Sequence, residues 1–309
     1  MTSHTQKNAF TMIELIMVIV VLGIVASIGA SMIAQTYQSY IMQKAIHNAS
    51  FKTELVVNTV ANRLAYRIDT SVVARRPGQV ANVIAADIYS LINIPPAQNT
   101  IFTILEWVNY ENDGFTATGT PGWSGFADLN NSTFATLSSP GSNFAVENTI
   151  RAELGFAGNP AIMFMGGSGI YRTDTNNSYD ATCIYQSAGC MFPVALAGTT
   201  LTFSGGDRSA GNMQYSEFYQ LAATAYAVVP SNPHTINGIN VWDLYLHSNY
   251  QPWDGENYTG ATRQSLLARD VSVFRFKQEP NSVRIKICSV QQIGDAKHIA
   301  ICKEKAVIR

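Results

Sequence analysis

Residues 10–34 read FTMIELIMVIVVLGIVASIGASMIA, and this stretch decides the architecture of the chain. From Leu15 to Ala34 it runs for 20 residues without a charge, which is long enough to cross a bilayer as a helix. A secretory signal peptide has a shorter apolar core with a small-residue cleavage site behind it. Here a polar segment, residues 1–9, precedes the apolar run and ends on the small residue Ala9. The pattern therefore predicts a membrane-spanning helix.

One acid, Glu14, lies near the head of this apolar run. A charge in such a position is costly unless it is paired, so an acid within a membrane segment indicates function by default. The ordinary alternative is a single-span anchor whose acid lies near the membrane interface. The residues on either side of Glu14 decide between the two interpretations.

Residues 7–24, KNAFTMIELIMVIVVLGI, resemble the class III leader and helix of type IV prepilins and type II secretion pseudopilins. The resemblance implies that a prepilin peptidase cleaves between Ala9 and Phe10 and methylates the new amino group of Phe10. Ala9 departs from the family pattern, which usually has Gly before the cut. The resemblance is specific over residues 1–35 and only architectural beyond them.

The resemblance also implies a role for Glu14 in assembly. A carboxylate inside hydrocarbon needs a partner, and the cationic N-terminus of a neighbouring subunit supplies one. The implied partners are other pilin or pseudopilin subunits, the prepilin peptidase and the inner-membrane assembly platform. The implied location is the inner membrane, crossed once, with the C-terminal domain in the periplasm and later extraction into a filament.

The helical pattern continues beyond the apolar run. Residues 35–69 contain no Gly and no Pro, and their apolar residues recur at helical spacing. The predicted stripe consists of Tyr37, Tyr40, Ile41, Ala45, Ile46, Ala49, Leu55, Val56, Val60, Leu64 and Ile68. We expect one helix from Phe10 to Asp69. The predicted organisation is a leader (1–9), a transmembrane or filament-core helix (10–34), an amphipathic helix (35–69) and a β-rich periplasmic domain (70–309).

The remaining sequence is typical of an antiparallel sheet. Runs rich in β-branched and aromatic residues predict strands over 101–110, 161–165, 199–203, 222–229, 239–247, 271–277, 283–290 and 299–308. Residues 116–143 are rich in Gly and Pro and are expected to be irregular. A long N-terminal helix packed on such a sheet is an α+β fold.

Four cysteines occur in two local pairs, and four cysteines allow three connectivities. Short loop closure favours Cys183 with Cys190 and Cys288 with Cys302. The spacings fit no zinc pattern, and an even count behind an exported N-terminus favours disulfides over unpaired thiols.

Charge is unevenly distributed along the chain. The net charge is −1, so bulk attraction to nucleic acid or anionic lipid is not implied. Between Thr70 and Thr262, however, 5 Lys and Arg face 14 Asp and Glu, a net of −9, whereas from Arg263 to Arg309 10 face 4, a net of +6. The simple interpretation is basic strands beside acidic loops of one domain. A basic docking or nucleic-acid-contacting face is the alternative, but no run of aromatics interleaves with the cations.

No catalytic pattern is present, and the sequence predicts no enzyme and no cofactor. The histidines lack metal-ligand spacing, and Gly122-Trp123-Ser124-Gly125 and Gly166-Gly167-Ser168-Gly169 are out of register for a nucleophile elbow. One calcium candidate places oxygen side chains at alternate positions, but a solvated turn is favoured. Its residues are Asp174, Asn176, Ser178 and Asp180.

The sequence thus predicts a minor pilin or pseudopilin of a type II secretion or type IV pilus-like filament. The alternative is a membrane-tethered periplasmic binding, adhesive or DNA-uptake protein that uses the prepilin route. A tethered enzyme is the third hypothesis, and no residue constellation supports it.

Overall fold

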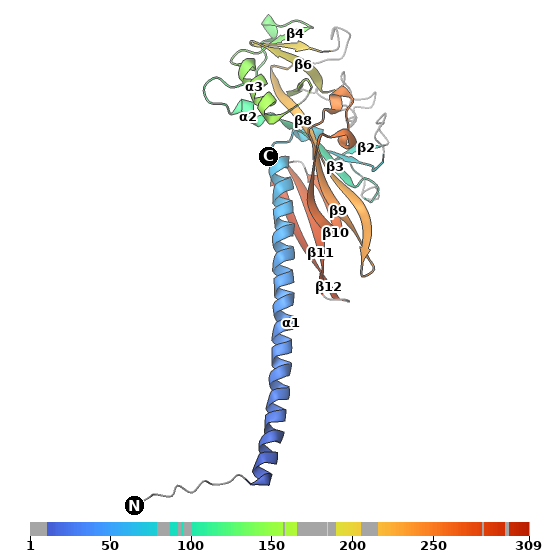
Figure 1. Cartoon of the computed structure of the whole chain (residues 1–309). Helices are drawn as coiled ribbons and strands as arrows, with labels where there is room; N and C mark the ends of the chain where they lie inside the picture. The colour runs from blue at the N-terminus through green and yellow to red at the C-terminus, as the bar shows by residue number, and fades with distance from the viewer. Residues whose placement is uncertain are drawn as a thin grey trace, which may run out of the picture.

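The computed structural model combines one long helix with an antiparallel sheet, as the α+β prediction expected (Figure 1). The helix leaves the globular domain as a stalk, and the sheet covers only its C-terminal part. The structure describes residues 11–78, 87–91, 94, 100–156, 158–165, 184, 190–204, 216–279, 281–293 and 297–308.

Helix α1 spans Met12–Leu64, 53 residues, which corresponds to a length of about 80 Å. The prediction that it continues to Asp69 was wrong. The chain beyond Leu64 joins the sheet instead, because the Ile68 N–H donates to Val108 O at 2.9 Å and the Tyr110 N–H donates to Tyr66 O at 3.0 Å. These bonds to β3 replace the next helical turn.

The two halves of α1 have different surroundings. Every large apolar side chain from Met12 to Ile46 is exposed, and we call this segment the free half. From Ala49 to Leu64, the docked half, one side of the helix is buried against the sheet. The predicted stripe is therefore correct for Ala49, Val56, Val60, Leu64 and Ile68. It is wrong as a description of intramolecular packing for Tyr37, Tyr40, Ile41, Ile46 and Leu55, which no strand covers.

Twelve strands in the described residues form the sheet, in the order β12-β11-β10-β9-β8-β5-β6-β7-β4, with β3 also paired to β8 and β1 joining β2 to β3. Strand β8 is the longest and pairs with three neighbours. The strands are β1 Val73–Arg75, β2 Ile88–Ser90, β3 Ile104–Tyr110, β4 Thr136–Ser138, β5 Ala161–Met165, β6 Phe192–Ala197, β7 Thr200–Phe203, β8 Phe218–Ile236, β9 Ile239–Ser248, β10 Arg263–Glu279, β11 Ser282–Ile293 and β12 Lys297–Ile308.

All eight predicted strand regions contain a strand, but several other elements were not predicted. Residues 116–143 are less irregular than expected, because they hold β4 and a 3-10 turn, Leu129–Asn131. Two short helices, α2 Asn112–Phe115 and α3 Phe144–Leu154, were also missed. For α3 the sequence did carry a signal, since Asn143 caps its start and Gly155 ends it in a left-handed conformation.

Two hydrophobic cores lie on opposite faces of β8. Ala225, Ala227 and Val229 belong to the core that also contains residues of β5, β6 and α3, whereas Tyr226 and Val228 belong to the core beneath α1. Because side chains alternate along a strand, a strand buried on both faces has a continuous apolar sequence. This explains why 222–229 is apolar without alternation.

The docked half is fastened to the last two strands. Thr53 Oγ1 lies 2.6 Å from Ser289 Oγ, and Lys305 Nζ donates to Asn58 Oδ1 at 2.8 Å. The predicted disulfide between Cys288 and Cys302 is confirmed, and it joins directly opposed residues of β11 and β12. Cys190 is also disulfide-bonded, but its expected partner Cys183 lies outside the described residues.

Candidate functional site

The candidate site is the free half of α1, with Glu14 in its first turn. Thr11 is the N-cap, and its hydroxyl accepts from the Glu14 N–H at 3.4 Å. The Glu14 carboxylate reaches back and accepts from the Thr11 N–H at 3.0 Å and from the Thr11 hydroxyl at 2.9 Å. This reciprocal arrangement is a capping box, which satisfies backbone donors that have no partner inside a helix.

The capping role of Glu14 was not predicted, although the sequence carried its signal. A Thr followed three residues later by Glu, directly before an apolar run, is the usual pattern for a capping box. In the isolated chain Glu14 therefore already has a local partner. That partner is neutral, so the charge of the carboxylate is not compensated by Thr11.

A cation for Glu14 is not available from its own helix. Between Phe10 and Lys44 the sequence contains no Lys and no Arg. At 1.5 Å per residue, Lys44 lies about 45 Å along the helix from Glu14. A counter-charge for Glu14 within a membrane must therefore come from the N-terminus of a chain or from another molecule.

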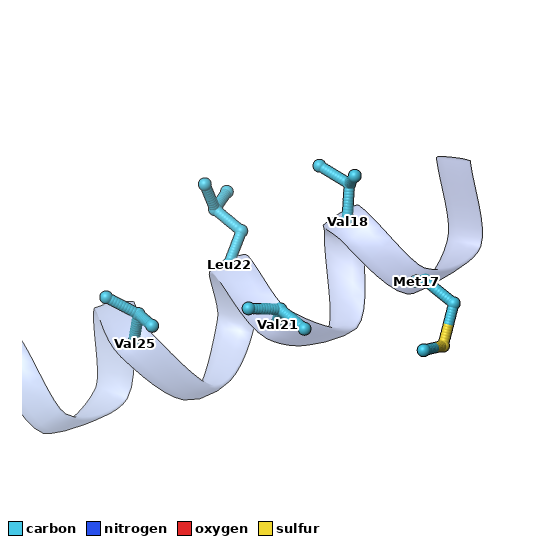
Figure 2. A pocket seen from close by; sticks show the side chains of 5 residues that line it. All are labelled: Met17, Val18, Val21, Leu22 and Val25. Carbon is cyan, nitrogen blue, oxygen red and sulfur yellow. The ribbon is translucent and has the colours of Figure 1, made fainter. Parts of the chain in front are cut away.

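From Leu15 to Ala34 the free half carries no charge and is apolar around its circumference. Figure 2 shows the side chains of Met17, Val18, Val21, Leu22 and Val25 standing out from the helix, and all five are exposed. Leu22, for example, is 67% exposed. A helix that is apolar all round is stable only in a core or in a membrane.

The described residues contain one helix that is long and apolar enough to cross a bilayer, and it is α1. Contiguous apolar patches larger than a few hundred Å² are rare on soluble monomers and mark interaction or membrane surfaces. The free half exceeds that size by its length alone. The helix can thus anchor the chain in a membrane or contribute its apolar side to a helical assembly.

The remaining predicted site residues contribute little to this picture. Ala9, Phe10 and Cys183 lie outside the described residues, as does the calcium candidate formed by Asp174, Asn176, Ser178 and Asp180. Over the described ranges, no group of three potential ligands from His, Cys, Asp and Glu comes together. The functional interpretation therefore depends on α1.

The buried acid Glu147 in the globular domain was not predicted, because nothing in its local sequence sets it apart. Glu147 on α3 is fully buried, and neither of its carboxylate oxygens has a hydrogen-bond partner. Burial and the neighbouring carboxylate of Glu111 raise the pKa of Glu147 to about 8, against the opposing effect of Arg151. Gly114 and Gly122 leave room for it, since a Cβ on either would overlap the carboxylate. Glu147 is mainly neutral at pH 7, which suits a structural role.

Comparison with known proteins identifies the N-terminal segment. Residues 5–30 match the prokaryotic N-terminal methylation motif. No curated protein and no solved structure matches the chain. The matched segment contains the Ala9–Phe10 junction, Glu14 and the start of the free half. The motif belongs to structural, non-enzymatic proteins, and it supports the assignment of this chain to the pilin-like proteins of the prepilin pathway.

Proposed function

We propose that the chain is a minor pilin or pseudopilin, a structural subunit of a type II secretion or type IV pilus-like filament. The observation that carries this proposal is the free half of α1, an uncovered helix with an apolar first part and with Glu14 in its first turn, inside a methylation motif. Residues 1–9 form the leader, 10–34 the membrane and later filament-core helix, and 70–309 the periplasmic domain.

Before assembly, the bilayer covers the apolar first part of the free half, up to Ala34. This part is long enough to span the hydrocarbon core, and the domain then remains on the periplasmic side. Prepilin peptidase cleaves between Ala9 and Phe10 and methylates Phe10. Cleavage creates a cationic amine only a few residues from Glu14 in the sequence.

During assembly, Glu14 exchanges a neutral partner for a charged one. The Thr11 N–H and hydroxyl that bind its carboxylate are replaced or supplemented by the N-terminal amine of a neighbouring subunit. An ion pair in a low-dielectric environment is much stronger than one in water, and it forms only at one axial offset between two helices. The apolar side chains supply the cohesion of the filament core, and the ion pair sets its register.

Two features favour a low-abundance subunit. The first is size, because the chain of 309 residues is larger than most major subunits. The second is that its globular domain carries the additional elements α2, α3, β4, β6 and β7. The presence of Glu14 argues against the class of tip subunit that lacks this acid. Partners are other pilin-like subunits, the prepilin peptidase and the inner-membrane assembly platform.

The decisive experiment compares two Glu→Ala substitutions in the same helix. Glu14→Ala should be cleaved normally yet stay in the inner membrane, with loss of secretion or piliation. Glu54→Ala is the matched control, because Glu54 lies in the docked half and makes only an exposed ion pair with Lys303 at 3.6 Å. It should behave like the native chain.

The same experiment separates the alternative functions. A membrane-tethered binding or adhesive protein would keep its activity in Glu14→Ala, since it needs only an anchor. Intact-mass analysis of the native chain provides the second measurement, with an expected mass of residues 10–309 plus one methyl group. A chain that begins at Met1 would contradict the proposal.

A further inference from the structure

A polar groove opens where α1 ends on the sheet. Its volume is about 420 Å³, which lies within the range of small-ligand sites. Residues at the end of α1, on α2, near the end of α3 and on β3, β8, β9 and β10 line it together. We call it the arginine groove and define it by Arg63, Tyr66, Asp113, Tyr226, Ser248 and Arg263.

The floor of the arginine groove is a row of residues across three strands. Tyr226 of β8 stands opposite Ser248 of β9, and Ser248 stands opposite Arg263 of β10. Directly opposed residues of an antiparallel pair point to the same face of the sheet, so these three side chains share one face. It is the face beneath α1, because Tyr226 belongs to the core under the helix.

Two arginines converge on this floor. Arg63 lies over the ring of Tyr226, with 5.7 Å between its Cζ and the ring centroid. Arg263 is held from the other chain segment by its Nη2, which donates to Leu154 O at 2.6 Å. Burial raises the pKa of Tyr226, and the charges of Arg63 and Arg263 oppose that rise. Both cations therefore lie near the same hydroxyl.

Neither arginine has a counter-ion in the part of the chain that the structure describes. Both side chains are exposed, and no ion pair of the described residues includes Arg63 or Arg263. A guanidinium group carries several N–H donors in a plane, which suits the two oxygens of a carboxylate or those of a phosphate. Two such groups in one groove attract an anion.

The acid in the groove restricts the charge of that anion. Asp113 is exposed on α2 and lines the arginine groove with the two cations. Coulomb repulsion grows in proportion to charge, so Asp113 repels a doubly charged phosphate about twice as strongly as a singly charged carboxylate. The groove thus favours a carboxylate.

The remaining lining suits a ring that carries hydroxyl groups. Tyr66 is 41% exposed, and its aromatic ring offers an apolar surface with a polar end. Asn112, Ser248 and Ser265 add amide and hydroxyl groups to the groove, and these exchange hydrogen bonds with hydroxyls. A sugar ring combines an apolar C–H face with hydroxyls along its edge, so it matches both kinds of lining.

We propose that the arginine groove binds an acidic sugar, that is, a sugar ring with a carboxylate. Arg63 and Arg263 hold the carboxylate, the ring packs on Tyr66, and Asp113 accepts hydrogen bonds from sugar hydroxyls. The inference goes beyond the proposed function, because it gives a structural subunit a ligand site in its globular domain. A single copy of the chain is sufficient for it, which agrees with a low-abundance subunit.

An acidic peptide fits the arginine groove less well than a sugar. An extended peptide gains affinity by adding its backbone to the open edge of a sheet. The three strands of the floor offer no such edge, since β8 pairs with β3, β5 and β9, β9 pairs with β8 and β10, and β10 pairs with β9 and β11. The backbone groups of a bound peptide would remain without partners.

The test measures binding to the full chain in detergent by isothermal titration calorimetry. The probes are trigalacturonate, which carries uronic acids, and sialyllactose, which carries a sialic acid. Galactotriose and lactose are their neutral counterparts. At least one acidic probe should bind at least about tenfold more tightly than its counterpart, because the carboxylate adds charge-assisted hydrogen bonds. The probe that binds identifies the source of the carboxylate.

Two substitutions with a matched control locate the site. Arg63→Gln with Arg263→Gln should weaken binding of the acidic probe by at least about tenfold. Lys52→Gln with Arg269→Gln is the control, because it also removes one exposed cation from α1 and one from β10 and leaves the groove intact. Arg63→Gln alone replaces the double substitution if loss of the Leu154 contact lowers the melting temperature.

A third residue tests the sugar ring rather than its charge. Tyr66→Phe should keep the binding of the native chain, because the aromatic face remains, whereas Tyr66→Ala should weaken it. Native binding by Tyr66→Ala would contradict the proposal.

The proposal is overturned if neither acidic sugar binds, or if the neutral counterparts bind equally well. It is also overturned if the arginine variant binds like its control, or if the peptide triglutamate binds as tightly as the sugar. None of these results changes the outcome expected for Glu14→Ala, so the two proposals can fail separately.

Discussion

The two halves of α1 belong to one helix, but only the docked half is buried against the rest of the chain. In the docked half, Val56, Val60 and Leu64 are buried against Phe274, Ile285 and other residues of the sheet. In the free half, side chains of the same kind, such as Leu22 and Val25, are 67% and 62% exposed. The side chains have the same chemistry in both halves. The halves differ because the sheet of the same chain covers only the docked half.

This difference indicates what the rest of the molecule must supply. Burial of apolar surface stabilises by about 25 cal/mol per Å², and the sheet provides it only for the docked half. The same stabilisation for the free half has to come from lipid or from other helices. The docked half fixes the globular domain to the stalk, while the free half remains available for a membrane and then for neighbours.

The largest expected effect comes from the same substitution in both halves. Leu64→Ala should lower the free energy of unfolding of the globular domain by about 2–5 kcal/mol, because it leaves a cavity at a fully buried position. Leu22→Ala should change it by less than about 0.5 kcal/mol. Denaturant unfolding of the full chain in detergent measures both, with tryptophan fluorescence as the signal. All four tryptophans lie outside α1, so their fluorescence reports on the globular domain. Equal effects of the two substitutions would contradict the difference between the two halves.

A second prediction concerns the strands that hold the docked half. Replacing Cys288 and Cys302 together by Ser should lower the free energy of unfolding by about 3 kcal/mol, the value expected for a loop of this length. The separation along the chain is 14 residues. Membrane insertion through the free half should be unchanged, which carbonate extraction of membranes can check. Loss of insertion would show that the two halves are not independent.

A third prediction concerns a pH-dependent effect and compares a buried acid with an exposed one on α3. Glu147 keeps its proton in the folded state up to about pH 8, whereas an unfolded Glu releases it near its ordinary pKa of 4.5. The folded state binds more protons between these values, so the free energy of unfolding falls as pH rises through this window. Glu147→Gln should remove that fall, which is about 1.4 kcal/mol per pH unit within the window.

Glu153→Gln is the control for this prediction, because Glu153 is exposed on the same helix. It should leave the pH profile of unfolding unchanged. The measurement is urea unfolding from about pH 5 to about pH 9. A native profile that is flat over this range would contradict the burial argument for Glu147.

Features that depend on a contiguous stretch of sequence could be predicted, whereas features that depend on contacts between distant residues could not. The uncovered apolar helix and Glu14 depend on a contiguous pattern, so residues 10–34 were sufficient to predict them. The strands from 271 to the C-terminus were found for the same reason. The end of α1 could not be predicted, because it is set by pairing of residues 66–68 with β3, far along the chain.

Other features depended on contacts that no local pattern encodes. Leu55 is exposed because it lies on the side of the docked half that faces away from the sheet, although Thr53 and Val56 next to it are buried. The orphaned carboxylate of Glu147 results from α2 and α3 meeting at two glycines. The spacing of Thr11 and Glu14 does encode the capping box, but an acid in a membrane segment is explained by an intersubunit ion pair without it.

The central claim is that the apolar first part of the free half, up to Ala34, is covered by lipid before assembly and by other subunits afterwards. A photo-crosslinking residue in place of Leu22 tests this most directly in cells with and without prepilin peptidase. The account predicts adducts to pilin-like subunits when the peptidase is present, and only lipid adducts when it is absent. Identical adducts in both cells, or none to any subunit, would contradict it.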